Sequence, residues 1–270
     1  MIELFEKDSK VNSRQSSKGN QLKWKGEDAF WYKADYTGYE GLAEYVVSSV
    51  LRHSTLDPAE YVTYETEKIH YKYQDYRGCK SVDFLPDGWK IITLERLFEN
   101  LKGESLTKSI YHIPGISERI RYVVENTEEL TGLTEFGAYI SKLMTVDALF
   151  LNEDRHTHNI AVLMDNNDRF QYCPIFDNGA SLLSDTMQDY PLEQKVEKLL
   201  HLVEAKTFSC NFDEQLDAAE ELYGRQLQFH CGKMDVEKVL RKEMYYPDEL
   251  KERIFYVLVH QMAKYKYLFC

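Results

Sequence analysis

The sequence has few cysteines and no pattern among them. Its five cysteines form no CxxC pair and no regular spacing, so neither a zinc site nor a disulfide framework is indicated. Also missing are an apolar run of about eighteen residues and, over Met1 to Lys10, the apolar segment of a secretion signal. These absences exclude a predicted membrane span and lead us to expect a cytoplasmic protein with reduced thiols.

An excess of positive charge is missing as well. The formal net charge is −12, with 33 Lys and Arg against 45 Asp and Glu. Because affinity for phosphate backbones depends on clustered basic side chains, this balance argues against general nucleic-acid binding. What the 270 residues do contain is 43% hydrophobic side chains, enough for the core of one large domain or of two lobes.

The first part of the chain is predicted to be rich in β-strands. A strand begins within residues 2–6, and four further β-prone runs predict an antiparallel sheet: 21–25, 29–36, 61–73 and 79–85. A turn is expected near 74–78. Apolar residues at helical spacing over 39–53 predict an amphipathic helix. Pro86-Asp87-Gly88 then interrupts the pattern, and we place the domain boundary between residues 86 and 87.

Beyond residue 86 most regular structure is predicted to be helical. Periodicity predicts these helices: 94–101, 116–130, 135–151, 192–205, 212–223, 236–244 and 248–268. Asp147 lies on an apolar stripe, so if buried it should be hydrogen-bonded, and we expect the backbone of the following loop to be its partner. A hairpin of 160–164 and 170–176 is joined by four turn-forming residues. The predicted fold is α+β, with a β-rich first domain, 1–86, and a mainly helical second domain, 87–270.

The stretch from Val146 to Asp177 carries the residues with catalytic chemistry. Asp154 follows a predicted helix, Asn159 begins the predicted hairpin and Asp177 ends it. Because a hairpin returns the chain to its starting end, we expect Asn159 and Asp177 to lie close together, and oxygen ligands of this kind suit Mg²⁺. Asp154 is then left to accept a hydrogen bond from a hydroxyl. Phosphoryl transfer needs these groups and a lysine on the nucleotide phosphates.

The same residues carry a resemblance to a known family. Asp154-x-x-x-x-Asn159 followed by Asp177-Asn178-Gly179 resembles the catalytic loop and metal motif of protein-kinase-like folds. The form Asp-Arg-His-x-x-Asn-Ile resembles HipA-type serine/threonine kinases and phosphoinositide kinases. The Leu149-Phe150-Leu151-Asn152 run and the spacing from Asn159 to Asp177 favour a HipA-like protein. The resemblance implies a two-lobed protein-kinase-like fold that uses ATP and Mg²⁺.

That resemblance implies a role for each residue of the motif. It places the catalytic base on Asp154 and the metal ligands on Asn159 and Asp177. The middle residue of the metal motif is Asn178 where many protein kinases have Phe, so the packing switch of those kinases is missing. Arg155 is expected to pair with a nearby carboxylate.

The nucleotide-binding residues follow from the same resemblance. The lysine falls on Lys33, with Lys23 and Lys25 as alternatives, and its glutamate partner falls on Glu44, with Glu40 as the alternative. The phosphate loop falls on Ser16-Ser17-Lys18-Gly19-Asn20, which matches no glycine-rich consensus. A serine in this loop, Ser16 or Ser17, is a hypothetical autophosphorylation site.

The sequence therefore predicts an ATP- and Mg²⁺-dependent HipA-like serine/threonine kinase with a protein substrate of unknown identity. An antitoxin-like partner is a further possibility that the resemblance raises. Two alternatives stay open. One is a lipid or small-alcohol kinase of the phosphoinositide-kinase type, and the other is a non-catalytic pseudokinase that acts as a binding module.

Overall fold

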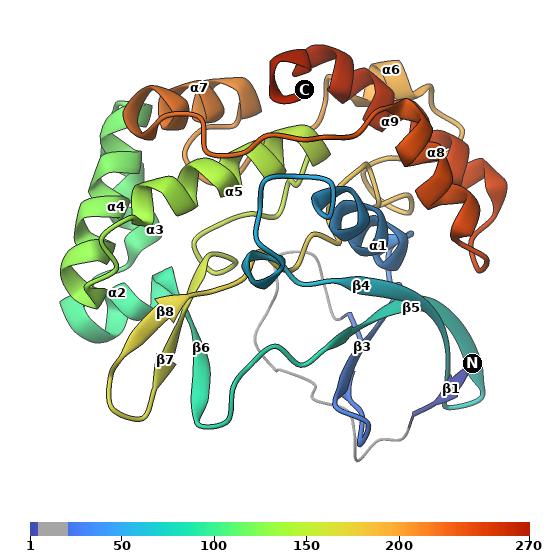
Figure 1. Ribbon diagram of the computed structural model, residues 1–270, viewed down its shortest axis with the longest axis horizontal. Helices are drawn as coiled ribbons and strands as arrows, with labels where there is room; N and C mark the ends of the chain where they lie inside the picture. Colours follow the sequence, from blue (N-terminus) through green and yellow to red (C-terminus); the bar gives the residue numbers. More distant parts are fainter. Residues whose placement is uncertain (5–20) are drawn as a thin grey trace. The chain divides into compact units, whose positions relative to one another are not determined.

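The computed structural model describes residues 1–4 and 21–270 (Figure 1). Its chain groups into two compact units. Unit 1 comprises Met1–Phe84, Phe176–Val203 and Gln228–Cys270, and unit 2 comprises Leu85–Ile175 and Glu204–Leu227. Each unit is assembled from separate segments of the chain. The predicted domain boundary between residues 86 and 87 therefore stays a prediction.

Within its described residues, unit 1 holds a five-stranded sheet of order β1-β4-β5-β3-β2. The pair β1 and β4 is parallel and the other neighbours are antiparallel. The strands are Ile2–Glu3 (β1), Lys23–Lys25 (β2), Phe30–Ala34 (β3), Tyr64–Tyr71 (β4) and Gln74–Val82 (β5). Each predicted strand of this region is confirmed, although its ends differ.

The turn predicted near 74–78 is wrong. Tyr71 pairs with Gln74, so the turn consists of Lys72 and Tyr73, which both have positive φ, 48° and 67°. Two positive φ angles suit the tight two-residue turn of a hairpin, which usually contains Asn or Gly. Because Lys-Tyr lacks that signal, the sequence pointed to the glycine farther along the chain.

The helix predicted over 39–53 is confirmed as α1, Glu40–Leu51. It packs on strands β4 and β5 (Figure 1). Its buried residues include Leu42, Val46 and Val50. A Cβ added to Gly41 would lie 2.5 Å from the backbone of Gly78 on β5. The absence of both side chains therefore lets the helix approach the sheet closely.

The last third of the chain contributes four further helices to the described part of unit 1. They are α6, Val196–Leu199, α8, Lys233–Lys242, α9, Asp248–Lys264, and the 3₁₀ helix η3, Lys266–Leu268; a further 3₁₀ helix, η2, spans Pro58–Glu60. The helices predicted at 236–244 and 248–268 are thus confirmed. The helix predicted over 192–205 is wrong, since only α6 forms. Of residues 192–205 only Leu199 and Ala205 are buried, so no continuous buried face stabilises a longer helix.

Unit 2, over its described residues, has a three-stranded antiparallel sheet of order β6-β7-β8. Its strands are Trp89–Thr93 (β6), Ala161–Asp165 (β7) and Phe170–Tyr172 (β8). The predicted hairpin of β7 and β8 is confirmed. Strand β6 was not predicted, because its pairing with β7 joins residues far apart in the sequence.

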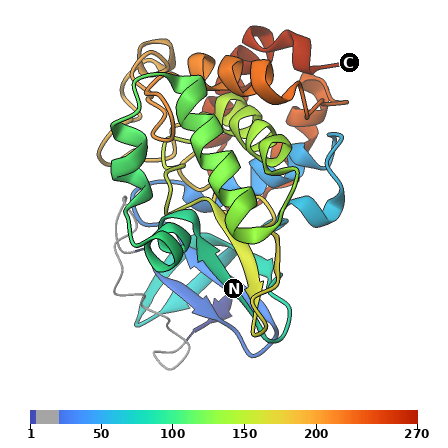
Figure 2. The same ribbon diagram turned by 90° about the vertical axis from the view of Figure 1, so that its left-hand side faces the viewer.

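Unit 2 contains five helices among its described residues, of which the helix Phe136–Phe150 is the most buried. They are α2, Leu94–Lys102, α3, Leu106–Tyr111, α4, Ile116–Thr131, α5, Phe136–Phe150, and α7, Phe212–Tyr223. Helix α5 is buried along most of its length and packs against α4 and α7, and Figure 2 shows α4 and α5, in shades of green, side by side. All of these except α3 were predicted. No helix among the described residues is both long and apolar enough to cross a bilayer.

Candidate active site

Lys33 is the centre of a charged group in unit 1. It lies on β3, and its Nζ donates to Glu44 Oε1 at 2.6 Å and to Asp177 Oδ1 at 2.7 Å. The side chains are 11%, 1% and 26% exposed for Lys33, Glu44 and Asp177. The ring of Tyr64 lies under the ammonium group, 5.1 Å from Nζ to the ring centroid. The structure therefore brings together the three residues that the resemblance selects.

The charges of this group depend on one another. Burial lowers the pKa of Lys33, but the carboxylates of Asp177 and Glu44 outweigh it and hold that pKa well above its usual value. Burial raises the pKa of Glu44, and Lys33 opposes the change only in part. Lys33 is consequently a fixed positive charge, positioned by two carboxylates from different segments of the chain.

Glu44 also holds the backbone next to Asp177. Its Oε2 accepts a hydrogen bond from the Asn178 N–H at 2.8 Å, so the glutamate binds both the lysine and the chain beyond the aspartate. Asp177 has a φ of 58°, in the left-handed region that Asp adopts more readily than most residues. Side chain and backbone together fix the direction of the Asp177 carboxylate.

The alternative residues have other partners. Lys25 pairs with Asp83 at 2.6 Å, and Glu40 accepts hydrogen bonds from the backbone N–H groups of Thr37 and Gly38. Lys23 does reach Asp177, with Nζ 3.7 Å from Oδ2. Lys33 and Glu44 are thus the pair in contact, with Lys23 as a second cation near the aspartate.

The loop that carries Asp154 belongs to unit 2. Helix α5 ends at Phe150, and the φ of 56° at the next residue, Leu151, turns the chain out of the helix. Asn159 Nδ2 donates to the backbone oxygen of Asp154 at 2.7 Å and to its Oδ2 at 3.1 Å. His156 Nε2 lies 3.7 Å from Asp154 Oδ1. The predicted base and one predicted metal ligand are therefore neighbours within one short loop.

A buried ion pair supports this loop from α5. Arg155 Nε donates to both carboxylate oxygens of Asp147, at 3.1 and 3.2 Å, and Nη1 donates to the Asn159 carbonyl at 3.3 Å. Burial raises the pKa of Asp147 to about 6, against the opposing effect of Arg155. The expected carboxylate partner of Arg155 is confirmed. The expected backbone partner of Asp147 is wrong, because the guanidinium occupies that position.

Some predictions fall outside what the structure describes. The predicted phosphate loop, Ser16-Ser17-Lys18-Gly19-Asn20, lies outside the described residues. Asn159 and Asp177 belong to different units, so their proximity stays a prediction. Within residues 1–4 and 21–270, no group of three or more His, Cys, Asp and Glu side chains is arranged to hold a metal ion.

One contact of the loop was missed by sequence reasoning. Thr157 Oγ1 donates to Glu95 Oε2, on α2, at 2.8 Å. The two residues are separated by 62 positions, and a glutamate in the first turn of a helix is ordinary. No local pattern in the sequence could have identified this contact.

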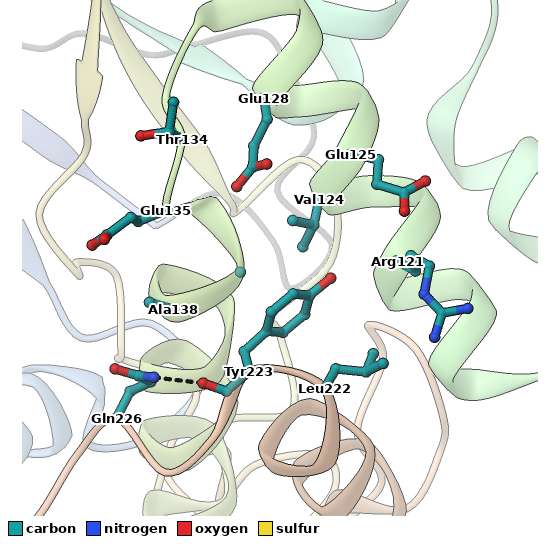
Figure 3. Close-up of a pocket in the computed structure, with 11 residues that line it drawn as sticks. Arg121, Val124, Glu125, Glu128, Thr134, Glu135, Ala138, Leu222, Tyr223 and Gln226 are labelled. Atoms are coloured by element: carbon teal, nitrogen blue, oxygen red, sulfur yellow. Dashed lines mark hydrogen bonds between the residues drawn. The ribbon is translucent and has the colours of Figure 1, made fainter.

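Unit 2 also contains a cavity of about 670 Å³, in which Tyr223 lies among the side chains of Glu125, Glu128 and Arg121 (Figure 3). Burial and the two glutamates raise the pKa of Tyr223. The lining residues come from α4, α5, α7 and adjoining turns: Arg121, Val124, Glu125, Glu128, Thr134, Glu135, Gly137, Ala138, Leu222, Tyr223 and Gln226. The cavity contains none of the predicted site residues, so we assign it no role in the predicted chemistry.

Comparison with known proteins identifies the fold. No protein-family model matches the sequence, and no curated protein matches it. A solved structure does match, that of a Helicobacter pylori proinflammatory kinase, CtkA, with a TM-score of 0.63 and 16% identity. The match covers 97% of this chain and 94% of that chain. At this identity the likeness shows the fold alone: the chain has a kinase-like α+β fold with a β-rich N-lobe and a mainly helical C-lobe.

Proposed function

We propose that the protein is an ATP- and Mg²⁺-dependent phosphotransferase, a serine/threonine kinase of the HipA type acting on a protein in the cytoplasm. The contact of Lys33 with both Glu44 and Asp177 carries the proposal, in a chain whose fold resembles that of a kinase. A lysine fixed by a glutamate and placed beside a metal-binding aspartate is the arrangement that holds nucleotide phosphates in kinases.

The donor groups suit the proposed nucleotide and metal. Asp177 offers a partly exposed carboxylate, and hard oxygen ligands are those that Mg²⁺ prefers. Asn159 directs its Nδ2 to Asp154, which leaves its carboxamide oxygen as the ligand atom. When bound, Mg²⁺ would offset the charge of the phosphates. Lys33 would contribute its fixed positive charge to the same phosphates.

Asp154 would orient the acceptor hydroxyl. Its carboxylate is partly exposed, and the bond from Asn159 Nδ2 to Oδ2 fixes one of its two oxygens. A carboxylate held in this way can accept a hydrogen bond from an incoming hydroxyl and later its proton.

The decisive experiment is an assay of ATP-dependent autophosphorylation with mapping of the modified residues, followed by protein substrates. Asp154→Asn and Asp177→Ala should each lower phosphate transfer by about 100-fold or more. Asp154→Asn should unfold at nearly the wild-type temperature, whereas Asp177→Ala also removes a partner of the Lys33 ammonium group and should unfold at a lower temperature. Asp87→Asn, at an exposed position, is the matched control and should keep full activity. Full activity in either site variant would contradict the assignment.

The acceptor class needs its own comparison. Radiolabelled ATP is supplied with phosphoinositide vesicles in one reaction and with a protein lysate in another. Label in protein alone supports the proposal, whereas label in lipid alone supports the phosphoinositide-kinase alternative. An antitoxin-like partner is part of the same proposal, and copurification from the source cells would test it.

A further inference from the structure

Glu95 is a buried carboxylate with an unusually complete set of donors. It lies in the first turn of α2 and is 2% exposed. It accepts hydrogen bonds from Ser105 Oγ at 2.6 Å, Thr107 N at 2.9 Å, Thr107 Oγ1 at 2.8 Å and Thr157 Oγ1 at 2.8 Å. Burial alone raises the pKa of Glu95, but these bonds outweigh it and lower that pKa. Glu95 is therefore an ionised acceptor at neutral pH.

The contact between Glu95 and Thr157 is reciprocal. The Glu95 N–H donates to the Thr157 carbonyl at 3.2 Å, while the Thr157 hydroxyl donates to the Glu95 carboxylate. The neighbouring Leu94 N–H donates to the Ile160 carbonyl at 2.8 Å. The start of α2 thus holds the loop by its backbone on either side of Asn159 and by one buried side chain.

Thr157 is well placed to transmit this restraint. It is 5% exposed and stands between Asp154 and Asn159, which are joined by the bonds from Asn159 Nδ2. A shift of Thr157 would move the chain that connects these two residues. The Asp147–Arg155 ion pair restrains the same loop from α5, so α2 supplies a second, independent anchor.

We infer that Glu95 is a positioning residue, which acts through Thr157 to hold Asp154 and Asn159 in their working arrangement. Glu95 has no direct contact with a reacting group in this assignment. The inference rests on the proposed kinase function for its effect on catalysis, but the anchoring of the loop can be measured without any activity.

The anchoring is tested by hydrogen exchange of the peptide covering residues 152–160. Thr157→Val removes the hydroxyl at nearly constant volume, and Glu95→Gln replaces one acceptor oxygen by a donor that faces other donors. Both should speed exchange of the His156 and Asn159 amides, which are bonded within the loop, by about tenfold or more. Thr157→Ser keeps the hydroxyl and should restore slow exchange.

The control is Thr145→Val, which removes another buried hydroxyl, one bonded to Ser141 O within α5. It should leave loop exchange unchanged. Unchanged exchange in Thr157→Val overturns the inference. If Glu95→Gln does not fold, comparing Thr157→Val with Thr157→Ser decides whether the network of Glu95, Thr107 and Thr157 anchors the loop through the Thr157 hydroxyl, which also lies 2.8 Å from Thr107 Oγ1.

The effect on catalysis is tested with the same variants. Thr157→Val should lower kcat by about 10- to 100-fold, because small misplacement of catalytic groups has effects of this size. The KM for ATP should change by less than about twofold, and Thr157→Ser should recover kcat. Faster loop exchange with an unchanged kcat overturns the positioning role. If the wild-type protein transfers no phosphate, the proposed function is refuted. The hydrogen-exchange experiment then still decides whether Thr157 anchors the loop.

Discussion

Lys33 and Glu44 are joined by a 2.6 Å hydrogen bond between buried side chains, and the same ammonium group donates to Asp177 at 2.7 Å. The lysine is therefore held between two carboxylates that would repel each other without it. The stability of the fold and the proposed binding of nucleotide therefore depend on the same residue.

Replacing Lys33 by Met should abolish the stabilisation of the protein by nucleotide. A ligand that binds only the folded state raises the melting temperature, so millimolar ATP with Mg²⁺ should raise Tm in the wild type and not in Lys33→Met. Lys25→Met is the control, because Lys25 pairs with Asp83 instead. An equal shift in Lys33→Met would refute the role of Lys33. No shift in the wild type would favour the pseudokinase alternative.

Local signals explain where the sequence predicted the fold well. The helix predicted at 212–223 forms as Phe212–Tyr223. The Asn211 side chain caps its start, and Gly224 with a φ of 74° follows its end, which are the signals that define helix termini. The β7–β8 hairpin was predicted for the same reason, because four turn-forming residues lie between two apolar runs.

Contacts between distant residues explain what the sequence could not predict. Trp89–Thr93 becomes a strand by pairing with Ala161–Asp165, and neither segment specifies the other. Glu95 meets Thr157 across 62 positions. In the site, the resemblance selected Lys33 and Glu44 as a pair, but the choice over the alternatives needed the observed contacts of Lys25 and Glu40. Sequence motifs select the candidate residues, whereas the contacts that support them are visible only in the folded structure.

Breaking the buried pair of Asp147 and Arg155 should strongly destabilise the protein. Both side chains are nearly inaccessible, at 0% and 2% exposed, so Asp147→Asn leaves a buried guanidinium without its counter-charge. We expect a loss of about 3–5 kcal/mol in the free energy of unfolding, measured by urea denaturation. Asp217→Asn, at an exposed position on α7, is the control and should change stability little. A loss below about 1 kcal/mol in Asp147→Asn would contradict the arrangement.

Asp35 should make stability depend on pH. Burial and the nearby Glu40 raise its pKa from 3.8 to about 7, against the opposing effects of the Gly41 N–H, Tyr246 and Arg77. Because the folded state binds the proton more tightly, the contribution of Asp35 is fully present below pH 3.8 and is lost as pH rises through about 7.

Asp35→Asn removes this titration and should therefore gain stability relative to the wild type between about pH 4 and pH 7. Its carboxamide can still accept from the Gly41 N–H, as Asp35 Oδ1 does at 2.7 Å. Urea denaturation of both proteins at a series of pH values measures the difference. A difference that is constant across this range would show that Asp35 titrates normally.

Gly78 should tolerate no side chain, although replacing glycine by alanine inside a strand usually stabilises it. A Cβ at this position would overlap the Lys33 carbonyl on β3, so Gly78→Ala must push β5 away from the strand that carries Lys33. Overpacking of this kind typically lowers stability by about 1–3 kcal/mol. The nucleotide-induced rise in Tm should also decrease, because Lys33 moves with its strand. Gly232→Ala is the control, since a Cβ there meets nothing within 4 Å. Equal stability of the two variants would show that β3 and β5 lie farther apart than the structure indicates.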